Sequence, residues 1–361
     1  MNSEIPGLRR DDNFKLTREG LASKVWLFEK LGQGAVAPHC LFLSSGYVGG
    51  VPQLGSCGWD LIEDHIVFYN AHGVRMAIFD RVFFVGHTGK LIILGKSLFE
   101  NDVTLILHER EPISRLAEGL DHDVLQPQGA RRRRRNLVVI RANEHSVHPS
   151  WPIDIPAEDR TWDLCTSFYG KEASFPPKDF AEYHVLQNKD QKWPAIHKLF
   201  HRSSAFWDYE YFLFPDDDIE TSWGGINRMF EICRRQGLHL AQPALAPGSF
   251  YAHPITVRNP AFSMRFTNFV EIMTPMFSRF ALEICAPTFA TSQIGCGLDY
   301  IWPHLLGNQT TRTAIIDETP VLHGRPIGQR YDIPAAYAEM VRVMAEYGAS
   351  VDQREFGGIT A

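Results

Sequence analysis

The segment YEYFLFPDDDIE, residues 209–220, decides how the rest of the chain is interpreted. An aromatic and apolar run of strand length ends in three consecutive carboxylates, Asp216, Asp217 and Asp218. In an α/β sheet, ligands bind at the carboxyl ends of the strands. Three adjacent acids repel one another, so several cannot be buried ionised without a compensating cation. The segment predicts a functional site, with a solvated acidic turn before the next helix as the structural alternative.

Carboxylate oxygens are hard ligands that suit Mg²⁺ or Mn²⁺, which often bind substrate phosphates as well. Because side chains alternate along an extended chain, Asp216 and Asp218 point the same way while Asp217 points elsewhere. The spacing therefore predicts a divalent metal site on the paired acids.

Composition limits the class of protein. The chain has 361 residues, enough for two domains, and its hydrophobic fraction of 44% and charged fraction of 22% are typical of soluble proteins. A net charge of −6 argues against general nucleic-acid binding. The six cysteines are scattered, which favours reduced thiols in a cytosolic protein. With neither a signal-peptide core nor a run of about 18 apolar residues, we predict a cytoplasmic protein, with contact at the inner membrane face left open.

The N-terminal third is expected to form a small antiparallel β domain. After a polar arm at residues 1–22, short apolar segments at 24–28, 62–69, 74–85, 90–94 and 103–108 are separated by the turn sequences NAHG and GHTG. This predicts a β-rich accessory or glycan-binding domain over residues 23–110. Its aromatic residues either stack on sugars or pack in the core; they are Trp59, Phe68, Tyr69, Phe83 and Phe84.

A linker at residues 111–135 ends in five consecutive arginines, Arg131, Arg132, Arg133, Arg134 and Arg135. They cannot all lie on one face of a helix or strand, so most must be solvated or paired with anions. The run is either an exposed linker or a site of attraction to an anionic membrane, worth about 1 kcal/mol per cation.

From residue 136 the pattern changes to alternating strands and helices. Residues 136–142 are a continuous β-branched run, as in a strand buried on both faces, and Arg141 and Asn143 stand at its end. Further strands are expected at 162–170, 209–214, 238–243 and 314–317, and helices at 190–202, 222–236 and 334–347. The pattern predicts an α/β domain over residues 136–348 and a tail at 349–361.

The order of motifs resembles GT-A-fold nucleotide-sugar glycosyltransferases. Three stretches are most similar to a glycosyltransferase-like family of unknown specificity found in plants and bacteria: 138–143, 162–170, and 208–211 through 242–243. The resemblance covers roughly residues 136–330. It implies a GT-A-like, Rossmann-like mixed sheet flanked by helices, with the β domain preceding it.

The resemblance also implies roles for individual residues. A metal ion would be bound by Asp216, Asp218 and His323, and Asp299 would deprotonate the acceptor in an inverting reaction. Contacts to the nucleotide or its phosphates would come from Arg141, Asn143, Asp163, Lys192, Asp216 and Asp217. The chain departs from the better-known Glu-Asp form of the base motif, because Leu298 precedes Asp299.

The predicted function is a metal-dependent glycosyltransferase using Mn²⁺ or Mg²⁺. It would transfer a sugar from a nucleotide-diphosphate sugar, UDP-linked before GDP-linked, to a glycan or lipid-linked glycan. One alternative is another metal-dependent enzyme acting on phosphate esters, such as a nucleotidyltransferase or phosphodiesterase. A second is a non-catalytic protein whose β domain binds glycans.

Overall fold

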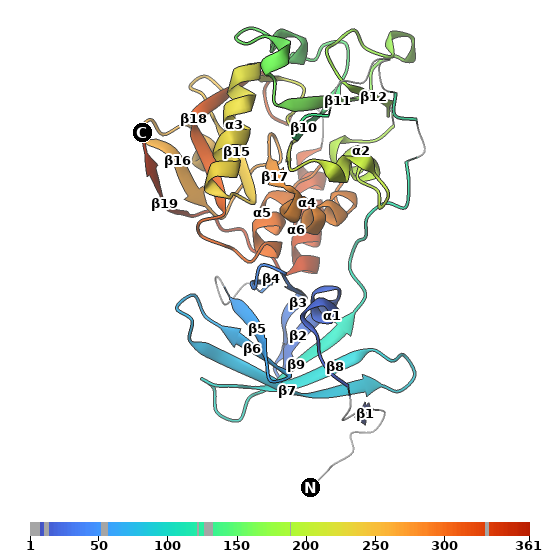
Figure 1. Cartoon of the computed structure of the whole chain (residues 1–361), viewed down its shortest axis with the longest axis vertical. Coiled ribbons are helices and arrows are strands. Elements are labelled where there is room, and N and C mark those ends of the chain that lie inside the picture. Colours follow the sequence, from blue (N-terminus) through green and yellow to red (C-terminus); the bar gives the residue numbers. More distant parts are fainter. Residues whose placement is uncertain are drawn as a thin grey trace. The chain divides into compact units, whose positions relative to one another are not determined.

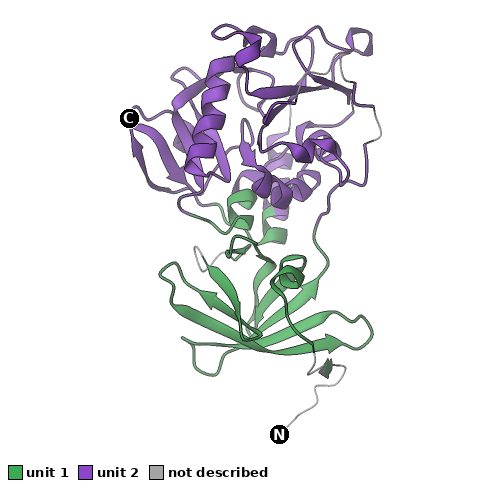
Figure 2. Cartoon of the chain, viewed as in Figure 1, with its two compact units in different colours: residues 1–113, 301–309, 344–351 green, residues 114–300, 310–343, 352–361 purple. Residues whose placement is uncertain are grey.

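The computed structural model describes residues 8–10, 14–51, 57–120, 123–125, 133–187, 189–328 and 332–361. It is a mixed α/β structure (Figure 1) whose contacts divide it into two compact units (Figure 2). Unit 1 contains residues 1–113, 301–309 and 344–351, and unit 2 contains residues 114–300, 310–343 and 352–361.

Unit 1 is built on a sheet in which every described strand pair is antiparallel, as the turn sequences predict. The path of the sheet is β4-β3-β2-β9-β8-β7-β6-β5, and β1 pairs with β7. A short helix, α1 (Arg18–Ala22), lies within the expected N-terminal arm, as does β1. The strands are β1 (Leu8–Arg10), β2 (Val25–Lys30), β3 (Gly34–Phe42), β4 (Val48–Gly49), β5 (Gly58–Ile62), β6 (His65–Tyr69), β7 (Arg75–Val85), β8 (Leu91–Ser97) and β9 (Thr104–Arg110).

The core of unit 1 contains two of the aromatic side chains for which the sequence left open either sugar stacking or core packing. Trp59 and Phe68 are 3% and 1% exposed, so neither can stack on a ligand. The Trp59 indole donates a hydrogen bond to the Leu43 carbonyl at 2.9 Å. These two residues therefore pack the core.

Two distant segments of the chain complete unit 1. The Gly50 N–H donates to the His304 carbonyl at 3.0 Å, and the rings of His39 and Tyr347 lie 4.9 Å apart. Residues 301–309 and 344–351 are thus part of the packing of the β-rich unit.

Unit 2 is built on a mixed sheet with the order β12-β11-β10-β13-β17-β15-β18-β16-β19, and β14 pairs with β18. Strands β10 to β13 are parallel where they pair, and β17 runs antiparallel to both of its neighbours. The strands are β10 (Asn136–Ala142), β11 (Trp162–Phe168), β12 (Tyr183–Leu186), β13 (Tyr211–Leu213), β14 (Ile219–Glu220), β15 (Leu240–Leu245), β16 (Phe262–Thr267), β17 (Met276–Ser278), β18 (Thr313–His323) and β19 (Glu355–Thr360).

Local sequence signals place several elements of this unit correctly. Every residue of β10 and β11 is buried, as expected for central strands. Helix α3 (Trp223–Gln236) begins after Ser222, whose hydroxyl accepts from the Gly225 N–H, and ends at Gly237 with a left-handed φ of 61°. The other α-helices are α2 (Lys192–Leu199), α4 (Arg279–Cys285), α5 (Leu298–Leu305) and α6 (Ile333–Tyr347).

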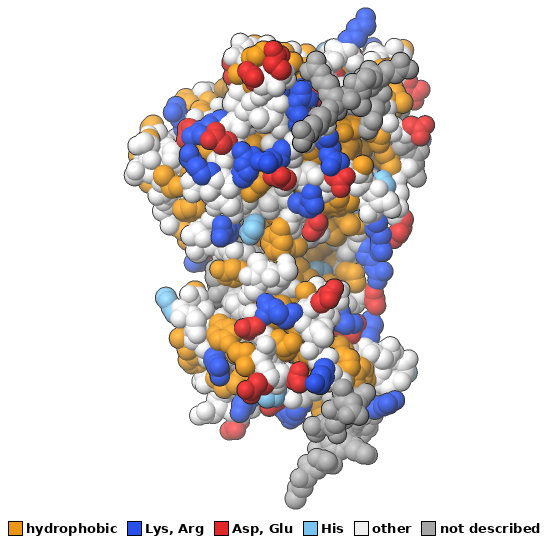
Figure 3. Space-filling model, in the orientation of Figure 1, with side chains coloured by type: hydrophobic (Ala, Val, Ile, Leu, Met, Phe, Trp, Pro, Cys, Tyr) orange, Lys and Arg blue, Asp and Glu red, His pale blue; other side chains and the backbone are white. Residues whose placement is uncertain are grey.

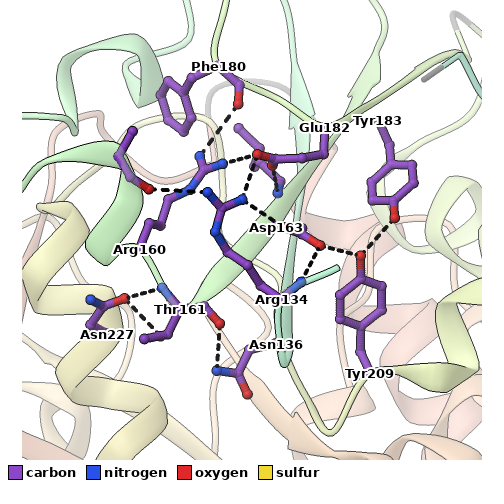
Figure 4. A network of polar contacts seen from close by, with 12 residues as sticks. Arg134, Asn136, Arg160, Thr161, Asp163, Phe180, Glu182, Tyr183, Tyr209 and Asn227 are labelled. Atoms are coloured by element: carbon purple, nitrogen blue, oxygen red, sulfur yellow. Dashed lines mark hydrogen bonds and ion pairs between the residues drawn. The ribbon is translucent and has the colours of Figure 1, made fainter. Parts of the chain in front are cut away.

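The described arginines of the linker pair with acids of the same chain. Arg133 contacts Asp208 at 2.7 Å, and Arg135 contacts Glu210 at 3.1 Å. Arg134 enters the network of Figure 4, in which its guanidinium contacts both Asp163 and Glu182 at 2.9 Å.

Arg131 and Arg132 lie outside the described residues. On the face shown in Figure 3, basic and acidic side chains are interspersed. No helix among the residues placed by the structure is long and apolar enough to cross a membrane. Arg133, Arg134 and Arg135 therefore pair with acids of the protein itself. Contact of the arginine run with a membrane stays a prediction.

Candidate active site

The candidate site lies at a switch point of the unit 2 sheet. The chain passes from β10 outward to β11 and β12 on one side, and then returns to pair β13 on the other side of β10. Ligands of α/β sheets bind at the carboxyl ends of the strands at such a point. Asn143 follows β10 and Asp217 follows β13, and the Val147 N–H donates to the Asp217 carbonyl at 2.8 Å. The two strand ends predicted to carry the site therefore meet.

Each of the three acids has its own basic partner. The nitrogen–oxygen distances are 2.6 Å for Lys192 with Asp216, 3.1 Å for Arg325 with Asp217 and 3.2 Å for His323 with Asp218. Three adjacent carboxylates need a compensating cation, and their pattern predicts a bound metal ion in that role. The protein itself supplies that charge, from α2, from the end of β18 and from the segment after β18.

Lys192 also contacts the backbone of the segment that precedes β17. Its ammonium also donates to the carbonyls of Ile272 and Met273 at 2.9 and 3.0 Å, and the Met273 carbonyl accepts from the Asp216 N–H at 2.8 Å. Burial lowers the pKa of Lys192, and the attraction of Asp216 only partly opposes that shift. These hydrogen bonds fix the Lys192 ammonium group beside Asp216.

The corner around Asp217 explains how Arg141 and Asn143 contribute. The Tyr169 hydroxyl donates to Asp217 at 2.7 Å and accepts from the Asn143 amide at 2.7 Å. The Arg141 guanidinium lies 5.1 Å from the centre of the Tyr169 ring and donates to the Ser167 hydroxyl at 2.9 Å. Burial lowers the pKa of Arg141 to about 10. Both residues reach Asp217 through Tyr169.

Asp218 and His323 form a buried pair across β14 and β18, where Ile219 is in register with His323. The His323 Nδ1 lies 2.7 Å from the Phe250 carbonyl, which can only accept, so Nδ1 carries a proton and Nε2 faces Asp218. Burial would raise the pKa of Asp218, but the hydrogen bond from His323 lowers it overall. Burial would lower the pKa of His323, but Asp218 raises it overall.

The predicted metal ligands are only partly brought together. Asp218 and His323 are adjacent, whereas Asp216 is engaged by Lys192. Within the described ranges, no group of three His, Cys, Asp or Glu side chains is arranged to hold a metal ion. The three predicted ligands are therefore not gathered into one metal site in this arrangement. Metal binding stays a prediction, and we assign no reaction step to a metal ion.

Asp163 does not lie with the other candidates. It is the second residue of β11, at the amino edge of the parallel strands, where it accepts from Arg134 and from the Tyr209 hydroxyl (Figure 4). The candidate site is at the carboxyl edge. Because Asp163 lies at the start of β11 and not at its end, the structure does not bring it to the site where a nucleotide contact was predicted.

Asp299 stands in the first turn of α5, after the glycine turn that the sequence shows. Its side chain is buried, with the residue 5% exposed, and burial raises its pKa to about 7. The His253 Nε2 lies 4.0 Å from its carboxylate. A carboxyl with this pKa can change its protonation state near neutral pH.

Glu271 is a buried acid that the sequence analysis did not select. It is 5% exposed, and its Oε2 has no hydrogen-bond partner among the described residues. Burial, followed by the charges of Asp299 and Asp216, raises its pKa to about 8. The sequence feature that could have identified Glu271 is its position as a single acid in the apolar segment FVEIM, residues 269–273. Tyr169 and Arg325 were also missed, although Tyr169 lies near the end of the strand expected at 162–170 and Arg325 is two residues after His323.

One protein-family model matches part of the chain. The model of a family of unknown function, DUF707, matches residues 179–268, which include Lys192 and the three acids. No curated protein matches the chain.

Among solved structures, the chain is similar to S. aureus TarS 1–349 in complex with UDP-GlcNAc, at 11% identity and a TM-score of 0.39, over 60% of this chain and 67% of that one. The full TarS structure matches at 9% identity and a TM-score of 0.38, over 60% of this chain and 40% of that one. Similarity at this level does not establish a shared fold or activity.

Proposed function

We propose that the protein is a glycosyltransferase that uses a nucleotide-diphosphate sugar as donor. The observation that carries this proposal is the pairing of three acids with three basic groups at the sheet's switch point, beside a second pair of buried carboxyls. The basic side chains of the first group would meet a diphosphate by sharing or exchanging their aspartate partners, and the second group would provide a base for an acceptor hydroxyl.

On the donor side, Lys192 and Arg325 are the cations best placed to meet phosphate oxygens. Each is now balanced by an aspartate, so an incoming diphosphate would share or replace that partner. Mn²⁺ or Mg²⁺ would add Lewis-acid stabilisation of the leaving diphosphate, and Asp218 with His323 is the pair to which it would bind. Metal dependence is a prediction for the experiment below.

On the acceptor side, Asp299 takes the role of base. The acceptor oxygen forms a bond to the anomeric carbon while the bond from that carbon to the diphosphate breaks. The bonding electrons leave with the diphosphate, and the acceptor proton passes to Asp299. Its pKa of about 7 suits this transfer near neutral pH.

The experiment that tests the donor site is calorimetric titration with UDP and with GDP, in Mn²⁺ and then in EDTA. We expect binding of one nucleotide in the presence of Mn²⁺ and its loss in Asp218→Asn, because that change removes the carboxylate that His323 pairs with. Asp64→Asn, in the exposed turn between β5 and β6, is the matched control. If neither nucleotide binds under any condition, the donor assignment is wrong.

A further inference from the structure

The segment Phe269–Met273 connects the two halves of the candidate site. At one end, the Phe269 ring lies 4.6 Å from the His253 ring and 5.0 Å from the Tyr300 ring, the two residues that flank Asp299. At the other end, the carbonyls of residues 272 and 273 hold Lys192. Glu271 therefore lies between the carboxyl expected to act as base and the cation expected to meet the donor.

The backbone at Glu271 is fixed, while its side chain has a free acceptor atom. The Glu271 N–H donates to the Gln242 Oε1 at 2.6 Å, and Gln242 is fully buried on β15. The carboxyl is buried as well, and its Oε2 lacks a partner among the residues that the structure places. Leaving a buried polar atom unsatisfied costs about 1–3 kcal/mol. A ligand that hydrogen-bonds to this atom would remove that cost.

The groups around Asp299 are also organised for a polar ligand. The Gln353 amide nitrogen donates to the His253 Nδ1 at 2.8 Å and to the Tyr300 hydroxyl at 2.8 Å. Because an amide nitrogen only donates, His253 Nδ1 accepts and the proton of the neutral ring sits on Nε2, facing Asp299. Burial lowers the pKa of His253, which favours this neutral form.

We propose that Glu271 and Asp299 form the acceptor pocket, in which the unpartnered Glu271 oxygen binds a sugar hydroxyl and orients its neighbour toward Asp299. The ligand class is a saccharide with adjacent hydroxyl groups, since two carboxyls at one site would each engage one of them. The acceptor role rests on the proposed function; the binding of a saccharide by Glu271 does not require it.

The electrostatics of the pair agree with separate roles. Burial and the nearby charges of Asp299 and Asp216 raise the pKa of Glu271 to about 8, while burial raises that of Asp299 to about 7. Glu271 therefore holds its proton to a higher pH than Asp299. One carboxyl then binds a hydroxyl while the other accepts a proton.

The test measures saccharide binding directly. Methyl glycosides of glucose, galactose, mannose and N-acetylglucosamine are titrated by saturation-transfer NMR into the full chain, with and without UDP. We expect at least one to bind, and Glu271→Met, which keeps the volume without the oxygens, to weaken that binding by about tenfold or more. Glu271→Gln keeps polar atoms in place and is expected to stay within about threefold of the wild type. Glu283→Met, exposed on α4, is the matched control.

Nucleotide titration of the same variants separates this inference from the proposed function. Glu271→Met is expected to leave the UDP or GDP affinity within about twofold, since the residue makes no ion pair to Lys192 or Arg325. Equal weakening of nucleotide and saccharide would place Glu271 on the donor side and overturn the inference, as would wild-type protein that binds none of the glycosides. Glycoside binding lost in Glu271→Met without any nucleotide binding would instead overturn the donor assignment alone.

Discussion

At the scale of single residues, burial raises the pKa of Asp299 into the range that suits a general base. A carboxyl with a pKa of about 7 is half ionised at neutral pH, and it can then accept a proton as the acceptor bond forms. We expect Asp299→Asn to reduce the transfer rate about 10²- to 10⁴-fold at pH 8. The rate of the wild type should rise through pH 7, as the carboxyl ionises, and the residual rate of the variant should lack this rise. A variant with the wild-type pH profile would show that another group is the base.

The same burial makes Asp299 a source of instability. Its folded pKa of about 7 lies above the ordinary value of 3.8, so between these pH values the folded state holds a proton that the unfolded state has released. Folding stability therefore falls as pH rises through this window. We expect Asp299→Asn to melt several degrees above the wild type at pH 8, with the difference disappearing near pH 4. Thermal unfolding at the two pH values measures this, and a variant that melts lower at pH 8 contradicts the buried-charge explanation.

At the scale of elements, the turn before α5 packs closely against helix α2, which carries Lys192. Gly295 has a φ of +98°, and a Cβ built on it would collide with the Trp193 ring, next to Lys192 in the sequence. We expect Gly295→Ala to destabilise the fold by about 1–3 kcal/mol and to weaken nucleotide binding, because Trp193 must shift and α2 with it. Urea unfolding and calorimetry measure the two effects.

Gly119→Ala is the matched control for this change. Gly119 has no positive φ, and a Cβ there would meet nothing within 4 Å. We expect its stability to stay within about 0.5 kcal/mol of the wild type. Equal effects of the two substitutions would show that the approach to Trp193 is unimportant.

At the scale of the whole molecule, the chain is interleaved, since unit 1 needs segments from beyond residue 300. Trp302 and Tyr347, which are 0% and 1% exposed, belong to its packing although they lie within the sequence range expected for the α/β domain. We expect fragment 1–113 to lack a cooperative thermal transition, because its core would lose these side chains. Circular dichroism of the fragment beside the full chain tests this. A sharp transition in fragment 1–113 would mean that the β sheet is sufficient by itself.

The sequence by itself determined the local structure of this protein and the place of its acids. The apolar runs at 136–142 and 162–168 predict strands buried on both faces, and the structure has them so. Ser222 and Gly237 mark the ends of α3 because helix capping depends only on residues near the helix ends. The glycine turns of the β domain are local in the same sense. For this reason the antiparallel sheet of unit 1 and the alternating strands and helices of unit 2 follow from the pattern of residues.

Only the tertiary structure decided which charges meet. Arg325 lies 108 positions after Asp217, and Lys192 meets carbonyls 80 and 81 positions later. Asp163 pairs with Arg134, 29 positions before it. The desolvation of Asp299 and Glu271 likewise depends on the atoms packed around them, not on their neighbours in sequence. Pairing and burial between distant segments arise from the packing of the whole sheet, and no local pattern encodes them.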